Sequence, residues 1–197
     1  MNVDTFSIIL VILVIIVCYR IYRNSDLFQL KCIISDVDGE KYCVRERNKI
    51  SEAADRLANV NKNLKSIIVY CEEKYPNDEI TIRMKNGYNP RSIVETLPTS
   101  EYTAYSENKG EKLAFCLNTK KGDQGKLIDM NTLTYVAIHE LAHIGTESIG
   151  HTPEFWKNFK FLLNVAKNIN VYSPIDYKKN PKEYCGMDIT DNPYYDA

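Results

Sequence analysis

An unbroken apolar run, FSIILVILVIIVCY, lies near the start of the chain over residues 6–19. A membrane-spanning helix needs about 17 to 25 residues. Ile21 and Tyr22, which follow Arg20, extend the apolar run to about 17 residues. The Arg20 side chain can reach the membrane–water interface, so it does not interrupt the span. The run has no polar face, which a helix on a protein surface needs. The sequence therefore predicts a transmembrane helix in residues 1–23 that contacts a lipid bilayer through residues 6–22.

The residues around this run favour an anchor that is not removed. The preceding residues, MNVDT, include an acid and no Lys or Arg, and no small-residue cleavage site follows, whereas a signal peptide has a basic start and such a site. Arg20, Arg23 and Lys31 all follow the run, and positive charge marks the cytosolic side. We expect a single-pass protein with its N-terminus outside and its catalytic domain in the cytosol.

Strand and helix patterns follow the anchor. Two β-leaning runs surround Asp38 and Gly39, which is typical of a hairpin, and residues 24–48 are assigned to a linker and this hairpin. Apolar residues then recur at three- and four-residue steps from Ser51 to Tyr75. This spacing predicts a long core helix.

The pattern continues with a second hairpin over residues 102–118, whose turn is predicted at residues 108–110. A glycine-containing loop is expected over residues 120–124. Helical periodicity returns from Asn131 and stops at Gly145. The sequence thus predicts a small antiparallel sheet, and after the loop a helix from about Asn131 to Gly145.

A last helix is predicted after Thr152, which is a favourable cap. Pro153 takes the first helical position and Glu154 lies in the positive first turn. The tail from Tyr172 is rich in Tyr, Lys, Asp and Pro, and we expect it to wrap the domain without forming another element. Residues 49–197 are therefore assigned to one α+β domain.

Composition limits the possible partners and compartments. The 197 residues suffice for one compact domain beside the anchor, and the 44% hydrophobic content excludes a disordered chain. The net charge of -1 and pI near 6.3 give no basic field, so no nucleic acid partner is expected. The six cysteines form no CxxC pair, which favours a reducing compartment, with a Cys32–Cys43 bridge across the first hairpin as the alternative.

The strongest chemical signal is the segment HELAHIGTESIGH, residues 139–151, which holds all three histidines of the chain. His139 and His143 lie four positions apart on a predicted helix, so both imidazoles project from one face and can hold one zinc ion. Glu140 follows the first of them and is the expected general base toward a zinc-bound water. These residue types at this spacing predict a hydrolytic Zn²⁺ centre.

A third protein ligand completes a catalytic zinc site and leaves one position for water. His151 is the expected third ligand, because it lies eight residues after the second histidine and directly before a capped helix. Glu147 and Glu154 are the competing candidates. A closed structural site would need a fourth ligand, which only Cys185 could supply from the distant tail.

The HELAH motif and the GHTPEFW run that follows resemble the zinc metallopeptidases of the WLM and SprT-like group, above all small membrane-anchored metallopeptidases of large DNA viruses. The resemblance implies a compact zincin-like α+β fold, zinc ligands at His139, His143 and His151, and a general base at Glu140. It also implies a protein or peptide substrate lying along a sheet edge, which chain order places at residues 112–117. A host or virion membrane would hold the anchor.

Two departures limit what the resemblance implies. In metzincins a glycine lies three residues and a histidine six residues after the second histidine. In this chain the glycine lies two residues and the histidine eight residues after His143, so metzincin membership is not expected. Met187 nevertheless resembles a Met-turn residue. WLM-type enzymes that cut protein crosslinked to DNA carry DNA-binding or partner-recruiting segments, and this sequence shows none. Their substrate is therefore not expected here.

The oxyanion of the tetrahedral intermediate needs a hydrogen-bond donor, and the sequence offers four weak candidates: Tyr172, Tyr184, Arg83 and Arg91. The predicted function is a membrane-anchored zinc metallopeptidase. A catalytically inactive, membrane-tethered zinc scaffold and a zinc hydrolase of non-peptide amides are the alternatives.

Overall fold

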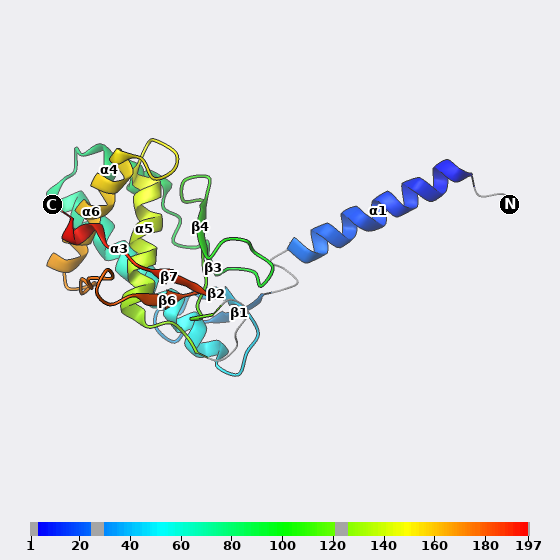
Figure 1. Cartoon of the computed structure of the whole chain (residues 1–197), viewed down its shortest axis with the longest axis horizontal. Helices are drawn as coiled ribbons and strands as arrows, with labels where there is room; N and C mark the ends of the chain where they lie inside the picture. The colour runs from blue at the N-terminus through cyan, green and yellow to red at the C-terminus, as the bar shows by residue number, and fades with distance from the viewer. Residues whose placement is uncertain (1–3, 25–29, 121–125, 197) are drawn as a thin grey trace.

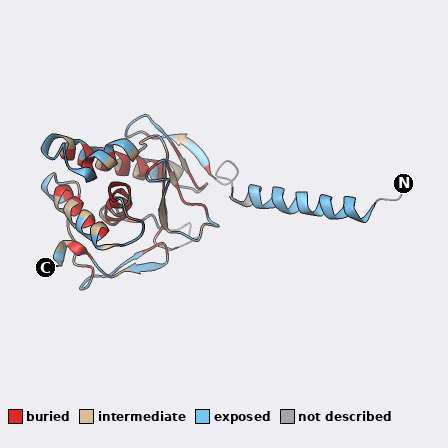
Figure 2. Cartoon of the chain, turned by 90° about the horizontal axis from the view of Figure 1, so that it is seen from above, coloured by how far each residue is buried: buried red, intermediate tan, exposed pale blue. Residues whose placement is uncertain are grey.

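The computed structural model describes residues 4–24, 30–120 and 126–196 of the chain. Its first helix, α1 (Thr5–Asn24), extends away from the rest of the chain (Figure 1), and its residues from Thr5 to Tyr22 are exposed (Figure 2). The segment Thr5–Tyr22 is long and apolar enough to cross a membrane. Apart from Lys120, the loop expected over residues 120–124 lies outside the described residues.

A five-stranded mixed sheet forms one side of the domain, in the order β1-β2-β3-β5-β4. Its strands are β1 (Lys31–Ile34), β2 (Lys41–Val44), β3 (Ile93–Glu95), β4 (Ala104–Glu107) and β5 (Lys112–Phe115). The two hairpins pair antiparallel as predicted, but β3 pairs parallel with both β2 and β5. The expected antiparallel sheet is therefore wrong at its centre, because the chain reaches β3 through a helical crossover, which returns a strand parallel to its predecessor.

The edge of this sheet differs from the edge expected at residues 112–117. Strand β5 lies inside the sheet, between β3 and β4, and β4 forms the edge. The chain passes from β3 out to the edge strand and then returns beside β3 as β5. A sheet edge available to a substrate is thus β4.

Four helices pack with the sheet around the core: α3 (Ile50–Lys74), α4 (Glu79–Gly87), α5 (Met130–Gly145) and α6 (Pro153–Asn168). The predicted helices α3, α5 and α6 are confirmed, whereas α4 was not predicted. Figure 1 shows α5 between the other helices and the sheet, and Figure 2 shows the buried faces turned inward. Phe115, Leu141 and Phe159 are fully buried where these layers meet.

The C-terminal tail contains elements that the sequence did not predict. Strands β6 (Lys182–Tyr184) and β7 (Met187–Ile189) form an antiparallel hairpin, and a 3-10 turn, η1 (Pro193–Tyr195), follows. The backbone N–H of Cys185 donates to the carbonyl of Asn118 at 3.1 Å. The tail is therefore an ordered wall of the domain.

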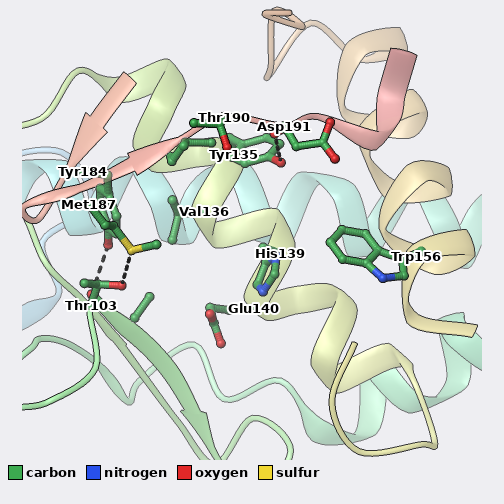
Figure 3. Close-up of a pocket in the computed structure, with 12 residues that line it drawn as sticks. Thr103, Tyr135, Val136, His139, Glu140, Trp156, Tyr184, Met187, Thr190 and Asp191 are labelled. Atoms are coloured by element: carbon green, nitrogen blue, oxygen red, sulfur yellow. Dashed lines mark hydrogen bonds between the residues drawn. The ribbon is translucent and has the colours of Figure 1, made fainter. Parts of the chain in front are cut away.

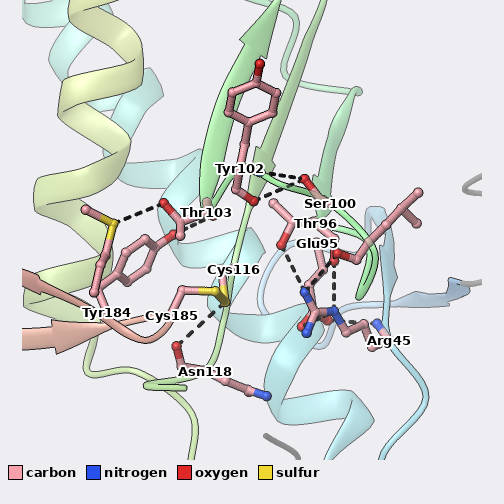
Figure 4. The surroundings of a disulfide bond; sticks show 12 residues. Arg45, Glu95, Thr96, Ser100, Tyr102, Thr103, Cys116, Asn118, Tyr184 and Cys185 are labelled. Atoms are coloured by element: carbon pink, nitrogen blue, oxygen red, sulfur yellow. Dashed lines mark hydrogen bonds and ion pairs between the residues drawn. A yellow bond between two sulfur atoms is a disulfide. The ribbon is translucent and has the colours of Figure 1, made fainter. Parts of the chain in front are cut away.

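Two disulfides overturn the expectation of reduced cysteines. Cys32–Cys43 joins β1 to β2, which was the alternative, and Cys116–Cys185 joins the chain after β5 to the β6–β7 hairpin. Figure 4 shows the second bond beside Tyr184. Its partners lie 69 residues apart, so only the fold brings them together. Cys185 is consequently not available as a zinc ligand.

Candidate metal centre

Helix α5 carries the first two imidazoles of the site. Its N-terminus is capped by Asp129, whose carboxylate accepts hydrogen bonds from the backbone N–H of Thr132 at 2.9 Å and from its hydroxyl at 2.8 Å. The Nε2 atoms of His139 and His143 lie 3.2 Å apart, one turn from each other. The predicted placement of both imidazoles on one helical face is therefore observed.

The end of α5 is fixed by close packing against α4. Gly145 is the last helical residue, and a Cβ atom there would lie 2.6 Å from Cγ1 of Ile80. A larger residue would push the two helices apart. The glycine predicted to stop the helix thus also sets its distance from α4.

His151 returns to the site from the loop between α5 and α6. Its Nε2 atom lies 3.0 Å from Nε2 of His139, and a ligand atom from each of the three histidines lies within 4.8 Å of the others. Glu147 and Glu154 lie outside this cluster in the described part of the chain. Of the three proposed third ligands, the structure brings His151 to the other two imidazoles.

Lys109, in the turn between β4 and β5, binds the loop that delivers His151. Its ammonium donates to the carbonyls of His143 at 3.2 Å, Thr146 at 2.7 Å and Ser148 at 3.2 Å. Cationic groups are favourable at a helix C-terminus, where carbonyls lack helical partners. No sequence signal pointed to Lys109, because its contacts depend on tertiary packing.

The other side of the same loop is held by Glu154. Its carboxylate accepts hydrogen bonds from the backbone N–H groups of Glu147 and Ser148, both at 3.2 Å, and from the Ser148 hydroxyl at 2.7 Å. The Arg83 guanidinium pairs with Glu147 at 2.6 Å and lies 3.8 Å from Glu154. Both competing third ligands therefore support the loop.

Aromatic rings enclose the imidazoles. Phe155 stacks on His143 with ring centroids 4.3 Å apart, and Phe159 meets His139 edge-on at 5.1 Å. Burial and the neighbouring imidazoles lower the pKa of His139 to about 3, whereas burial, His151 and the Lys109 ammonium lower the pKa of His143 to about 4. Both rings are thus neutral at physiological pH, which is the form that binds a metal ion.

These residues fit a zinc ion. Two nitrogens bound tetrahedrally at about 2.0–2.1 Å from one zinc lie about 3.3 Å apart, close to the observed 3.0 and 3.2 Å. In the described chain the cluster consists of three imidazoles without cysteine or carboxylate. Such a set leaves a coordination position open, as a catalytic zinc requires.

Glu140 follows His139 on α5 and lines the same cavities as that imidazole. Its side chain is largely buried, and burial raises its pKa to about 8. These two cavities meet at the site. The carboxylate is therefore placed where a reacting group at the site would contact it.

The two cavities lie along the edge strand β4. One, of about 310 Å³, includes Thr103 and Ala104, and Figure 3 shows it beside His139 and Glu140. The other, of about 450 Å³, includes Tyr105, Ser106 and His151. A chain lying along β4 would pass both cavities.

The weak oxyanion candidates are placed very differently. Tyr184 lines the first cavity, and its hydroxyl donates to the carbonyl of Thr103 at 3.2 Å. The Tyr172 hydroxyl accepts a hydrogen bond from Asn192 instead, and Arg83 binds the glutamates of the loop. Arg91 lines neither cavity. Of the four candidates, Tyr184 alone lines a cavity at the site.

Comparison with known proteins gives an extended match to this chain. It is 32% identical over 162 residues to "Uncharacterized protein R325" of Acanthamoeba polyphaga mimivirus, which covers 80% of this chain and 81% of that protein. The chain belongs to the family of R325. Two further relatives share about a third of their residues with it over shorter segments. Protein 136R of Invertebrate iridescent virus 6 is 32% identical over 98 residues, which cover 49% of this chain and 53% of that protein. Protein 042R of Invertebrate iridescent virus 3 is 33% identical over 102 residues, which cover 52% of this chain and 58% of that protein.

These three relatives come from viruses, and no family model matches the chain. Among solved structures, Wss1 from Saccharomyces cerevisiae is 16% identical, with a TM-score of 0.47, and covers 65% of this chain and 88% of that chain. A Wss1 mutant gives a TM-score of 0.46. The functional conclusion therefore comes from the site geometry of this chain.

Proposed function

We propose that this protein is a membrane-anchored zinc metallopeptidase of the WLM type. The observation that supports it is the meeting of three imidazole nitrogens, 3.0 and 3.2 Å apart, with Glu140 at the junction of two cavities. His139, His143 and His151 hold the zinc ion. Glu140 is the general base.

The three imidazoles would hold a zinc ion, which when bound would supply a Lewis acid and make a water molecule more acidic. The pKa of Glu140 falls when a cation lies at the imidazoles, because the opposite charge favours the ionised carboxylate. Glu140 then accepts a proton from the attacking water and delivers it to the nitrogen that leaves. Its burial excludes bulk water from this proton transfer.

The substrate class follows from the edge strand. In the described chain β4 pairs with β5 alone and forms the edge of the sheet, where an extended peptide would add a strand. The cavities along β4 would receive its side chains. Protein or peptide substrates therefore fit better than a small amide.

The decisive experiment measures zinc and hydrolysis together on the full chain in detergent. We expect about one zinc per chain by elemental analysis, cleavage of an unfolded protein such as reduced casein, and loss of cleavage with retained zinc in Glu140→Gln. Zinc without cleavage of any polypeptide would favour the scaffold or the non-peptide amidase. A folded chain that binds no zinc would overturn the proposal.

We further propose that residues 1–23 anchor the protein in a host or virion membrane, ahead of the linker and hairpin (24–48) and the catalytic domain (49–197). Support comes from the apolar, exposed segment Thr5–Tyr22. The basic residues after it favour a cytosolic domain, whereas the two disulfides favour an oxidising environment such as a virion surface. Both signals agree if the virion membrane is wrapped with its cytosolic face outward, because the domain then faces the cytosol before assembly and the virion exterior afterwards.

This topology is tested by protease protection and thiol alkylation. In intact cells the catalytic domain should be digested only after the plasma membrane is permeabilised. On intact virions it should be digested directly, and its four bridged cysteines should resist alkylation until reduced. A domain protected within sealed microsomes would overturn this orientation.

A further inference from the structure

The Cys116–Cys185 disulfide joins the sheet to a wall of the first cavity. Cys116 directly follows β5, and Cys185 lies in the turn between β6 and β7. Tyr184, the residue before Cys185, lines the cavity together with His139 and Glu140. Figure 4 shows the bond beside the Tyr184 ring. The bond therefore fixes the hairpin next to the residues proposed for zinc binding and catalysis.

The hairpin and the sheet meet at Thr103, which lies just before the edge strand β4 and lines the same cavity. Its carbonyl accepts hydrogen bonds from the backbone N–H of Cys116 at 2.8 Å and from the Tyr184 hydroxyl at 3.2 Å. Its hydroxyl donates to the sulfur of Met187 at 3.5 Å. The hairpin supplies two of these three contacts, so the start of β4 depends on where the hairpin lies.

The hairpin itself offers little buried surface to hold it in place. Tyr184 is the buried residue of its two strands, and the other strand residues are exposed or half-buried. Two backbone hydrogen bonds join it to the chain after β5, from Cys185 to Asn118 at 3.1 Å and from Gly186 to Thr119 at 2.8 Å. A two-stranded hairpin is marginally stable by itself, and segments with few buried contacts open first. The disulfide is therefore the main tie between the hairpin and the sheet.

The turn of the hairpin is strained at Cys185. The backbone φ is 51° at Cys185 and 78° at Gly186. Hairpin turns with two positive φ values favour Asn-Gly or Gly-Gly, because most other side chains are strained there. The bond to Cys116 offsets this strain, so reduction of the bond favours opening of the turn.

We propose that Cys116–Cys185 is a redox switch: the zinc-loaded peptidase is active with the bond closed and loses activity when both cysteines are thiols. The proposal rests on the peptidase function. Opening of the bond releases the hairpin, which withdraws Tyr184 from the cavity wall and removes two of the three contacts of Thr103. The three imidazoles lie on α5 and the loop after it, so zinc binding does not change.

Switching is a thiol–disulfide exchange. On oxidation the two thiols give up two protons and two electrons to a disulfide oxidant such as oxidised glutathione, which becomes two thiols, and a thiol reductant reverses the reaction. Cys116 is 0% and Cys185 3% exposed, so the hairpin opens before a reductant reaches the bond. The cytosol keeps cysteines reduced, whereas extracellular surfaces allow bridges. With the topology proposed above, the enzyme is switched on after virion assembly.

The first test titrates the bond in the full chain in detergent, with Cys32→Ser and Cys43→Ser introduced to remove the other bridge. The zinc-loaded protein is equilibrated with reduced and oxidised glutathione, desalted and assayed on casein, and alkylation with mass spectrometry gives the bridged fraction. We expect kcat to fall at least tenfold as the bond opens and to return on reoxidation, with about one zinc per chain throughout. Full activity with the bond open, or loss of zinc in parallel with activity, would overturn the switch.

Paired serine variants provide the matched comparison. Cys116→Ser with Cys185→Ser should be slow at every glutathione ratio, whereas Cys32→Ser with Cys43→Ser should match the wild type when oxidised. A folded Cys116→Ser, Cys185→Ser protein that cuts casein at the wild-type rate would overturn the switch. The titration needs neither of these two substitutions, so it decides the proposal even if that variant does not fold.

The second test does not depend on hydrolysis. Hydrogen exchange is measured by mass spectrometry on zinc-loaded Glu140→Gln protein, oxidised and reduced. We expect residues 182–189 to exchange at least tenfold faster when reduced, with α5 unchanged, and equal exchange would overturn release of the hairpin. Faster exchange without cleavage by either form of the active chain would support release and count against the peptidase. Cleavage by both forms at one rate would support the peptidase and overturn the switch.

Discussion

The Lys109 ammonium lies 2.7 Å from the carbonyl oxygen of Thr146, just beyond the last turn of the helix that carries the HExxH motif. It joins the β4–β5 turn to the loop that delivers His151, so a residue outside the motif holds the third imidazole near the other two. Groups that orient metal ligands typically contribute 10- to 100-fold to metal affinity.

We therefore expect Lys109→Met to weaken zinc binding about tenfold or more without unfolding the domain. The measurement is zinc competition against a chromophoric chelator, with circular dichroism as the check on folding. Lys65→Met, on the exposed face of α3, is the matched control and should keep wild-type affinity. Equal affinities in the two variants would show that Lys109 does not position the loop.

Glu140→Gln should retain zinc and lose hydrolysis by about 10²- to 10⁴-fold in kcat, because a general base contributes on this order. Elemental analysis and a fluorogenic peptide assay measure the two effects. Glu73→Gln, on the exposed surface of α3, should remain fully active. An active Glu140→Gln protein would mean that another group takes the proton.

His151→Ala should lower zinc affinity at least tenfold, since it removes one of three protein ligands. Glu147→Gln is the comparison variant, because this exposed carboxylate lies outside the imidazole cluster and only pairs with Arg83 at the loop, so its loss should weaken binding less than loss of His151. The dissociation constants are compared by chelator competition. Weakening by the glutamate variant alone would make Glu147 the third ligand.

The two disulfides should stabilise the domain unequally. Cys116–Cys185 spans 69 residues and Cys32–Cys43 spans 11, so loop-closure entropy makes removal of the first costlier by about 1.5 kcal/mol in the free energy of unfolding. Urea denaturation of the two paired Cys→Ser variants measures this difference, with Cys18→Ser as control. A larger loss from the shorter loop would contradict the entropic account.

Membrane insertion is tested by placing two arginines in the centre of α1, at Leu13 and Ile16. Each should cost about 2.5–3.5 kcal/mol in insertion free energy, so the protein should move from the carbonate-resistant fraction to the soluble fraction. Arginines at the exposed positions Ile34 and Val37 of the domain should leave it in the membrane fraction. A doubly substituted α1 that still resists carbonate would contradict a membrane-spanning α1.

Helices were predictable where the spacing of apolar residues or a capping residue marks them in the local sequence. Helix α6 begins as expected because Thr152 accepts a hydrogen bond from the Phe155 backbone, and α3 shows its periodicity over seven turns. Helix α4 was missed, since nine residues give too short a pattern to recognise. Strand β3, with three residues, was missed for the same reason.

Long-range relationships were not predictable from local signals. The sequence of the second hairpin does not indicate which of its two strands pairs with β3. Because β5 forms this pair, β4 becomes the edge strand of the sheet. The β6–β7 hairpin contains charged, exposed residues in its short strands and is held to the domain in part by Cys116–Cys185. The motif gave the candidate ligands, but Lys109 and the cavity walls depend on how distant segments meet.

The Cys116–Cys185 bond closes a covalent ring that contains both α5 and α6, and therefore all three imidazoles. A peptide bond cut anywhere inside this ring leaves the two pieces joined through sulfur. If the protein cuts itself there, it still migrates as one species on a non-reducing gel and separates into two only after reduction. Any such self-cleavage would therefore go unseen in an experiment that omits a reductant.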